Sequence, residues 1–273
     1  MRSAITRGIA AAAMLALGTV LQAANGVIIT QKVTTGDSTQ THQVQLDANH
    51  MRAEVQGARG ESQIIIFDGA KQVLYIVNPE RKTYSEMTKE DADKLGAQVN
   101  DAMAQMQAQM ANLPPEQRAQ IEAMMKGRGM GAAMGGGASK PEYKKTGTDT
   151  VGKWTCDKYE GYTNGQKTNE VCTVDPKALG FTAADFAVTR QMADFFTRIM
   201  PQGASRIFSI GDPAVQGYAG IPIRMTSTMM GRTSTSELQD VTRGSIPDTA
   251  FEVPAGFQKE PFMGGMGRGR GRQ

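Results

Sequence analysis

The sequence predicts a mainly β protein of the α+β class, in which an antiparallel sheet is interrupted by an inserted helical hairpin. Residues 27–84 contain six short β-branched or aromatic runs separated by turn residues, with no helical segment between them. Two other segments, 88–113 and 182–199, have apolar residues at helical spacing behind a capping box. Because strand follows strand directly, an antiparallel meander is expected.

The six expected strands are separated by turn residues such as Asp68-Gly69 and Asn78-Pro79. They are Val27–Thr34, Gln40–Leu46, Met51–Val55, Gln63–Phe67, Val73–Val77 and Lys82–Tyr84.

The inserted segment, residues 88–138, is expected to form a helical hairpin and a linker. Thr88 and Asp91 form a capping box, and Pro114-Pro115 stops the first helix. A second helix is expected over Glu116–Lys126, followed by a glycine and methionine linker over Gly127–Gly137. The apolar face of the first helix consists of Leu95, Val99, Met103, Met106, Met110 and Leu113.

Strands resume after Pro141, and a second helix with a well-defined apolar face follows them. Thr182 and Asp185 form its capping box, and Pro201 ends it. The later strand alternates apolar with polar residues and turns at Gly231-Arg232, with glycine first. We expect the helix and this strand to face each other across an apolar cavity, with Val188, Met192, Phe195 and Ile199 on the helix and Ile221, Ile223, Met225 and Met229 on the strand.

The N-terminus has the layout of a secretory signal. Arg2 and Arg7 precede the apolar run Gly8–Leu21, and small residues follow at Ala23 and Ala24. The run is shorter than the roughly 20 residues that a membrane span needs, so we expect cleavage after Ala23 or Ala24 and release into the periplasm, without an integral membrane anchor. An uncleaved anchor is the alternative. The expected division is therefore a signal peptide (1–24), one β domain (25–262) and a disordered tail (263–273).

The charge of the chain gives no reason to expect a nucleic-acid partner. The formal net charge is +3, and loss of the two signal arginines leaves +1. A chain this close to neutrality has no broad attraction to polyanions.

The two cysteines, Cys156 and Cys172, are expected to form a disulfide in an oxidising compartment. A three-residue hairpin loop at Thr163–Gly165 would place them opposite each other. The same register sets Trp154 against Val174 and Lys158 against Glu170. The alternative, a redox or metal pair, lacks a CxxC motif and a nearby histidine.

Several segments resemble the bacterial DUF4412 family and, more distantly, the LolA/LolB lipoprotein-carrier fold. They are Val44–Leu46, Met51–Glu54, Phe67–Gly69, Asn78–Tyr84, Gly152–Tyr159, Gly220–Pro222 and Ile246–Phe257. The resemblance covers most of the expected mature chain except the helical insertion and the tail. It implies a strongly curved sheet, forming an incomplete barrel whose open side is covered by helices over an apolar cavity. In LolA such a cavity takes lipoprotein acyl chains, so the resemblance implies an apolar ligand here.

No catalytic motif is apparent, so we expect a non-enzymatic protein without a cofactor. There is no nucleophile elbow, no HExxH and no phosphate-binding glycine loop, and the two histidines, His42 and His50, are isolated. The first hypothesis is a periplasmic binding or carrier protein for lipid or lipoprotein acyl chains. One alternative is a structural envelope protein without a ligand. The other is copper handling by thioether ligands at MxxM and MxxxM spacing, from Met103, Met106, Met110, Met124, Met125, Met130 and Met134.

Overall fold

The computed structural model describes residues 23–56, 61–114, 116–117, 120, 141–199, 213–229 and 231–262. The expected signal segment up to residue 22, most of the second inserted helix, the linker, the expected helix end at Pro201 and the tail from residue 263 lie outside the described residues.

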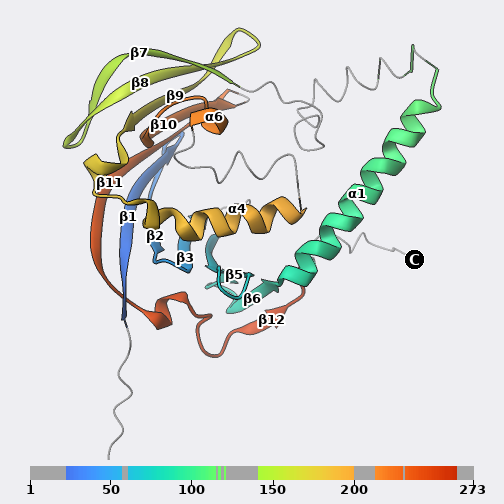
Figure 1. The fold of residues 1–273 in the computed structure, drawn as a ribbon, viewed down its shortest axis with the longest axis horizontal. Coiled ribbons are helices and arrows are strands. Elements are labelled where there is room, and N and C mark those ends of the chain that lie inside the picture. Colours follow the sequence, from blue (N-terminus) through green and yellow to red (C-terminus); the bar gives the residue numbers. More distant parts are fainter. Residues whose placement is uncertain are drawn as a thin grey trace, which may run out of the picture.

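The described chain forms one open sheet of twelve strands in the order β12-β6-β5-β4-β3-β2-β1-β11-β10-β9-β8-β7 (Figure 1). All neighbours are antiparallel except β12 and β6, which are parallel. The predicted fold class is confirmed, since β7 and β12 are free edges of an unclosed sheet. The strands are β1 (Ala23–Thr35), β2 (Ser38–Leu46), β3 (His50–Gln56), β4 (Ser62–Asp68), β5 (Val73–Asn78), β6 (Thr83–Met87), β7 (Glu142–Val151), β8 (Trp154–Thr163), β9 (Gln166–Val174), β10 (Ile221–Met229), β11 (Arg232–Pro247) and β12 (Gln258–Glu260).

The centre of the sheet joins the two ends of the chain. β1 pairs with β2 on one side and with β11 on the other, from Ala23 opposite Pro247 to Thr35 opposite Ser234. The six strands expected in residues 27–84 are all present as β1 to β6, in a meander.

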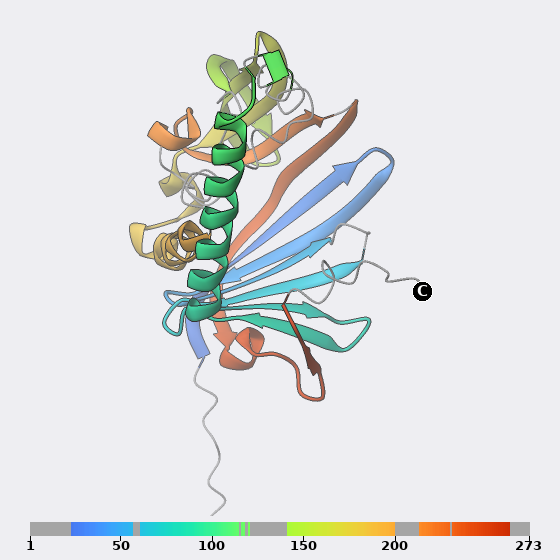
Figure 2. The same ribbon diagram turned by 90° about the vertical axis from the view of Figure 1, so that its right-hand side faces the viewer.

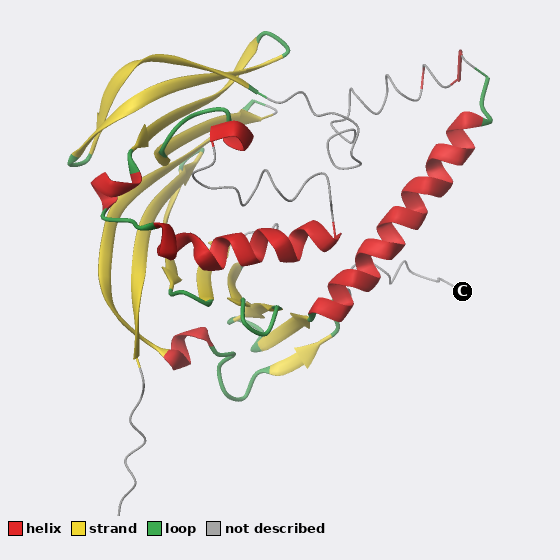
Figure 3. Cartoon of the chain, in the orientation of Figure 1, coloured by secondary structure: helices red, strands yellow, loops and turns green. Residues whose placement is uncertain are grey.

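Helices cover one face of this sheet (Figure 3). α4 (Ala187–Ile199) follows two 3₁₀ turns, η1 (Pro176–Leu179) and η2 (Ala183–Phe186), and a four-residue helix, α6 (Pro213–Gln216), precedes β10. The predicted apolar face of α4 is buried at all four positions, Val188, Met192, Phe195 and Ile199. Figure 2 shows the sheet opening away from α1 and α4 toward the tips of its hairpins.

The first inserted helix, α1 (Lys89–Ala111), begins at the expected capping box. The Thr88 hydroxyl accepts a hydrogen bond from the Asp91 amide at 3.2 Å, and the Thr88 amide donates to the Asp91 carboxylate at 3.1 Å. Only Ala92 and Gly96 of α1 are buried, where the helix meets α4. The expected apolar face is only half-buried further along the helix, at Val99, Met103 and Met106.

Each face of the sheet carries its own core, because alternate residues of a strand point to opposite faces. On β4, Phe67 joins the main core beneath α4, whereas Ile64 and Ile66 belong to a second cluster. The C-terminal segment, with η3 (Asp248–Phe251), supplies Phe251 to this second cluster, and β12 then pairs with β6. The sequence patterns did not predict this second layer.

The disulfide between Cys156 and Cys172 is confirmed, but the predicted hairpin register is wrong. The loop has two residues, not the expected three, so Thr163 lies opposite Gln166. An irregularity between Gly161 and Tyr162 moves the pairing by a further residue, so that near the disulfide it differs from the predicted register by two residues. Asn164 and Gly165 both have positive φ, 52° and 79°, as a type I′ turn requires. Lys158 therefore lies opposite Cys172, and the disulfide joins diagonal neighbours 5.5 Å apart at Cα.

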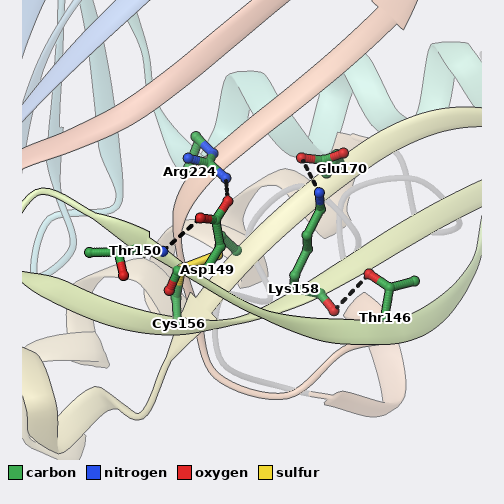
Figure 4. Close-up of a disulfide and its surroundings, with 8 residues drawn as sticks. Thr146, Asp149, Thr150, Cys156, Lys158, Glu170 and Arg224 are labelled. Carbon is green, nitrogen blue, oxygen red and sulfur yellow. Dashed lines mark hydrogen bonds and ion pairs between the residues drawn. A yellow bond between two sulfur atoms is a disulfide. The ribbon is translucent and has the colours of Figure 1, made fainter.

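The charged pair predicted beside the disulfide survives this shift. Lys158 Nζ lies 3.2 Å from Glu170 Oε1, across the diagonal between β8 and β9 (Figure 4). Arg224 of β10 forms an ion pair with Asp149 of β7. The two ion pairs therefore connect side chains of all four strands from β7 to β10.

Candidate functional site

An apolar cavity of about 300 Å³ lies between the sheet and the segment that leads into α4. Five strands form its floor, and η1, η2 and α4 form its cover. The lining residues are Ile29, Gln31, Val44, Leu46, Met51, Ala53, Leu179, Phe181, Phe186, Thr189, Met192, Ile221, Pro222, Leu238 and Val241.

Strand pairing explains why the floor is apolar. Ile29 of β1 pairs with Val44 of β2, which in turn pairs with Ala53 of β3, so the three side chains point to one face. On β11, Leu238 and Val241 are three residues apart, yet both line the cavity. An irregularity in the β1–β11 register at Gln239 allows this, because one extra residue restores the same face.

The part of the cover that precedes α4 consists of residues 176–186, which we call the cover segment. Leu179 and Phe181 are buried, and the Phe181 and Phe186 rings lie 5.4 Å apart between their centroids. Gly180, between Leu179 and Phe181, adopts φ of 71°, which a residue with a side chain rarely adopts. This turn directs both apolar side chains toward the sheet.

Arg243 of β11 fastens the cover segment to the sheet. Its guanidinium donates two hydrogen bonds to the Asp185 carboxylate, at 3.1 and 2.6 Å, and two to the Gly180 carbonyl, at 3.2 and 2.5 Å. Asp185 also accepts from the amide and the hydroxyl of Thr182. The Arg243 hydrogen bonds, with the amide of Thr182, lower the pKa of Asp185 to about 2.

Among the described lining residues, two have polar side chains, Gln31 and Thr189. The Thr189 hydroxyl donates to the Phe186 carbonyl at 2.9 Å. No Asp, Glu, Lys, Arg or His is among the described residues of the lining. A lining of this kind suits an apolar group.

The eight predicted cavity residues are only partly brought together. Met192 and Ile221 line the cavity. Val188, Phe195, Ile199 and Ile223 are buried in the adjoining core, where Phe195 packs edge-on against Phe67 with ring centroids 5.5 Å apart.

Met225 does not share a face with Ile221, contrary to the predicted alternation. Ile221 pairs with Val174 and Met225 with Val171, three residues apart on β9, so the two side chains point to opposite faces. The cause is a bulge between Pro222 and Arg224. The side chain of Met229 lies outside the described residues. The turn that follows β10 has Gly231 as its second residue, not its first, because Met229 pairs with Arg232.

Sequence reasoning missed the floor from β1 to β3. The signal was present in the alternation of Val27 with Ile29 and of Val44 with Leu46, which marks one buried face on each strand. The alternation predicts the strands, but it does not identify the segment that covers their common face.

Three of the seven methionines proposed for copper lie in the described part of α1, and Met124, Met125, Met130 and Met134 lie outside it. Within the described residues, no group of three or more His, Cys, Asp or Glu side chains is suited to hold a metal ion. No helix in the same part of the chain is long and apolar enough to cross a membrane.

An unclosed antiparallel sheet, with helices and an apolar cavity on one face, places this chain in the class of incomplete β-barrels. The model of a family described as "Domain of unknown function (DUF4412)" matches residues 89–257, more than half of the sequence. The chain therefore belongs to the DUF4412 family. The match begins at α1 and so includes the inserted segment that we expected to lie outside the resemblance.

Three solved structures are similar to this chain at low identity. An uncharacterized conserved protein from Thermus thermophilus is 8% identical with a TM-score of 0.42, over 89% of this chain and 91% of that one. MucB, in complex with MucA(peri), is 11% identical with a TM-score of 0.35, over 86% of this chain and 56% of that one. A LolA superfamily protein from Nitrosomonas europaea is 10% identical with a TM-score of 0.27, over 85% and 90%. No curated relative matches at significant similarity.

Proposed function

We propose that this protein is a periplasmic, non-enzymatic binding or carrier protein that shelters one apolar chain in the cavity beneath the cover segment. The observation that carries the proposal is a preformed cavity of about 300 Å³, in which all but two of the described lining residues are apolar. An apolar ligand that enters such a preformed site removes its own surface and that of the lining from water, which is the favourable contribution to binding.

The volume favours a single chain. Ligand sites commonly span about 300–1,000 Å³, and this cavity lies at the lower end of that range. We therefore expect the cavity to shelter one chain, or one acyl group of a larger molecule.

Export is proposed from two features of the sequence. Residues 1–24 have the layout of a secretory signal, and the Cys156–Cys172 disulfide is of the kind that forms in oxidising compartments. N-terminal sequencing of the exported protein should begin at Ala24 or Asn25. Recovery of intact Met1 in the membrane fraction would contradict export with cleavage.

Binding is tested with an uncharged fluorescent probe, N-phenyl-1-naphthylamine. We expect the protein to bind it at micromolar concentration, and native mass spectrometry of protein purified from periplasm should show a co-purified apolar molecule. Val44→Phe fills the floor of the cavity, so it should weaken probe binding about tenfold or more with little change in Tm. The matched control is Gln43→Phe, at an exposed neighbouring position, which should leave binding unchanged. Absence of probe binding by the unmodified protein would refute the proposal.

A further inference from the structure

We propose that the cavity selects an uncharged acyl derivative, an ester or an amide, over a free fatty acid, and that Gln31 is the residue that makes this selection. The inference rests on the proposed function and names the chemistry of its ligand. It depends on three observations, which are the lack of charge in the lining, the free amide of Gln31 and the position of Gln31 along β1.

The lining offers no compensation for a charged ligand group. None of the described side chains that line the cavity is ionisable. His42, which pairs with Gln31 across β1 and β2, is not among the lining residues. Arg243, at the edge of the cover, donates to Asp185 and to the Gly180 carbonyl, so its guanidinium is already engaged. A carboxylate placed in an apolar site without a cation loses its hydration and gains nothing in return.

Gln31 is the polar group that remains available to a ligand. Thr189 has given its hydroxyl hydrogen to the Phe186 carbonyl, but the Gln31 side chain has no hydrogen-bond partner among the described residues. Its amide carries two donors and one acceptor. The donors suit the carbonyl oxygen of an ester or an amide, and the acceptor suits the N–H of an amide.

The position of Gln31 fixes the orientation of the ligand. Along this face of β1, Val27 is buried in the core, Ile29 and Gln31 line the cavity, and Val33 lies between Gln40 and Ser236. From Val27 toward Val33, the surroundings of this face thus change from apolar to polar, and Gln31 lies at the change. The acyl tail would point toward Val27, and the ester or amide would meet Gln31 at the polar end.

The experiment compares three ligands with the same ten-carbon acyl group as competitors of N-phenyl-1-naphthylamine at pH 8. These are 1-decanoylglycerol, an ester of the kind lipids present, N-decanoylglycinamide, an amide of the kind acylated proteins present, and decanoate. The variant is Gln31→Leu, which keeps the volume of the side chain and removes its hydrogen bonds. Gln43→Leu, on the other face of the neighbouring strand, is the control.

We expect at least one uncharged ligand to bind tenfold or more tightly than decanoate. Gln31→Leu should weaken that ligand about three- to tenfold, the effect of one lost hydrogen bond, while Gln43→Leu changes nothing. The tighter of the two uncharged ligands identifies the source of the acyl group. Equal binding of decanoate, or an unchanged preference in Gln31→Leu, would overturn the inference. Binding of the probe without competition by any acyl ligand would overturn it and leave the proposed function standing. No binding of the probe would end both.

Discussion

Replacing Gly96 with alanine tests the contact between α1 and α4. A Cβ at position 96 would overlap the Arg198 carbonyl oxygen and lie 3.0 Å from the carbonyl carbon, both backbone atoms. In an exposed helix the same change stabilises a protein by about 1 kcal/mol, because alanine is the better helix former. Here the helices must separate, and overpacking of this kind costs about 1–3 kcal/mol. Ala92, the other buried residue of α1, would lose its cover at the same time.

The net expectation is a loss of about 1–2 kcal/mol, since the steric cost exceeds the gain in helix propensity. For a chain of this size that lowers Tm by roughly 3–6 °C. The matched control is Gly244→Ala on β11, where no atom lies within 4 Å of the added Cβ and Tm should hold or rise. Calorimetry measures Tm for the unmodified protein, Gly96→Ala and Gly244→Ala. A Tm for Gly96→Ala equal to or above that of the unmodified protein would refute the close approach of α1 to α4.

Three further predictions concern the ion pair between Arg243 and Asp185, the disulfide and the core. Because the pKa of Asp185 is lowered to about 2, its contribution is fully present above the ordinary pKa near 4 and is lost as pH falls toward 2. Asp185→Asn should therefore lower the free energy of urea unfolding at pH 6 by about 1–2 kcal/mol, a value reduced for the 49% exposure of the Arg243 side chain. The difference between the two proteins should shrink by pH 2.5. A difference that stays constant with pH would contradict a stabilising ion pair at Asp185. Replacing Cys156 and Cys172 together with alanine should cost about 3 kcal/mol under oxidising conditions, and a loss below about 0.5 kcal/mol would exclude a structural role. Phe195→Ala, at a side chain with 0% exposure, should lower the free energy of unfolding by about 3–5 kcal/mol. Met225→Ala should lower it clearly less, because the bulge on β10 turns this half-buried side chain away from the main core. Equal losses in the two variants would argue against the bulge.

Local signals predicted the elements well. The six strands in residues 27–84 are short β-branched or aromatic runs separated by turn residues, and the capping boxes at Thr88 and Thr182 mark two helix starts. These features depend on residues a few positions apart. The disulfide pairing was also local, because parity along a hairpin is kept even when the register moves by two residues.

The faces and the long-range pairings could not be predicted in the same way. The bulge between Pro222 and Arg224 inserts one residue, and this is enough to turn Met225 away from Ile221. Periodicity cannot anticipate such an insertion, because Ile221, Ile223 and Met225 alternate perfectly in the sequence. The cavity floor was missed for a related reason, since it combines strands whose partners are set by tertiary contacts.

The pairing of β1 with β11 constrains when this chain can fold. Its first described strand finds one of its two neighbours only in residues 234–247, near the other end of the sequence. Bringing such distant segments together is a slow step with a large loop-closure entropy. Strands β1 to β6 can pair locally, but the two halves of the sheet join only when β11 reaches β1. If the chain emerges from its N-terminus, β1 keeps one unpaired edge until that join is made. An unpaired strand edge is a site at which chains aggregate.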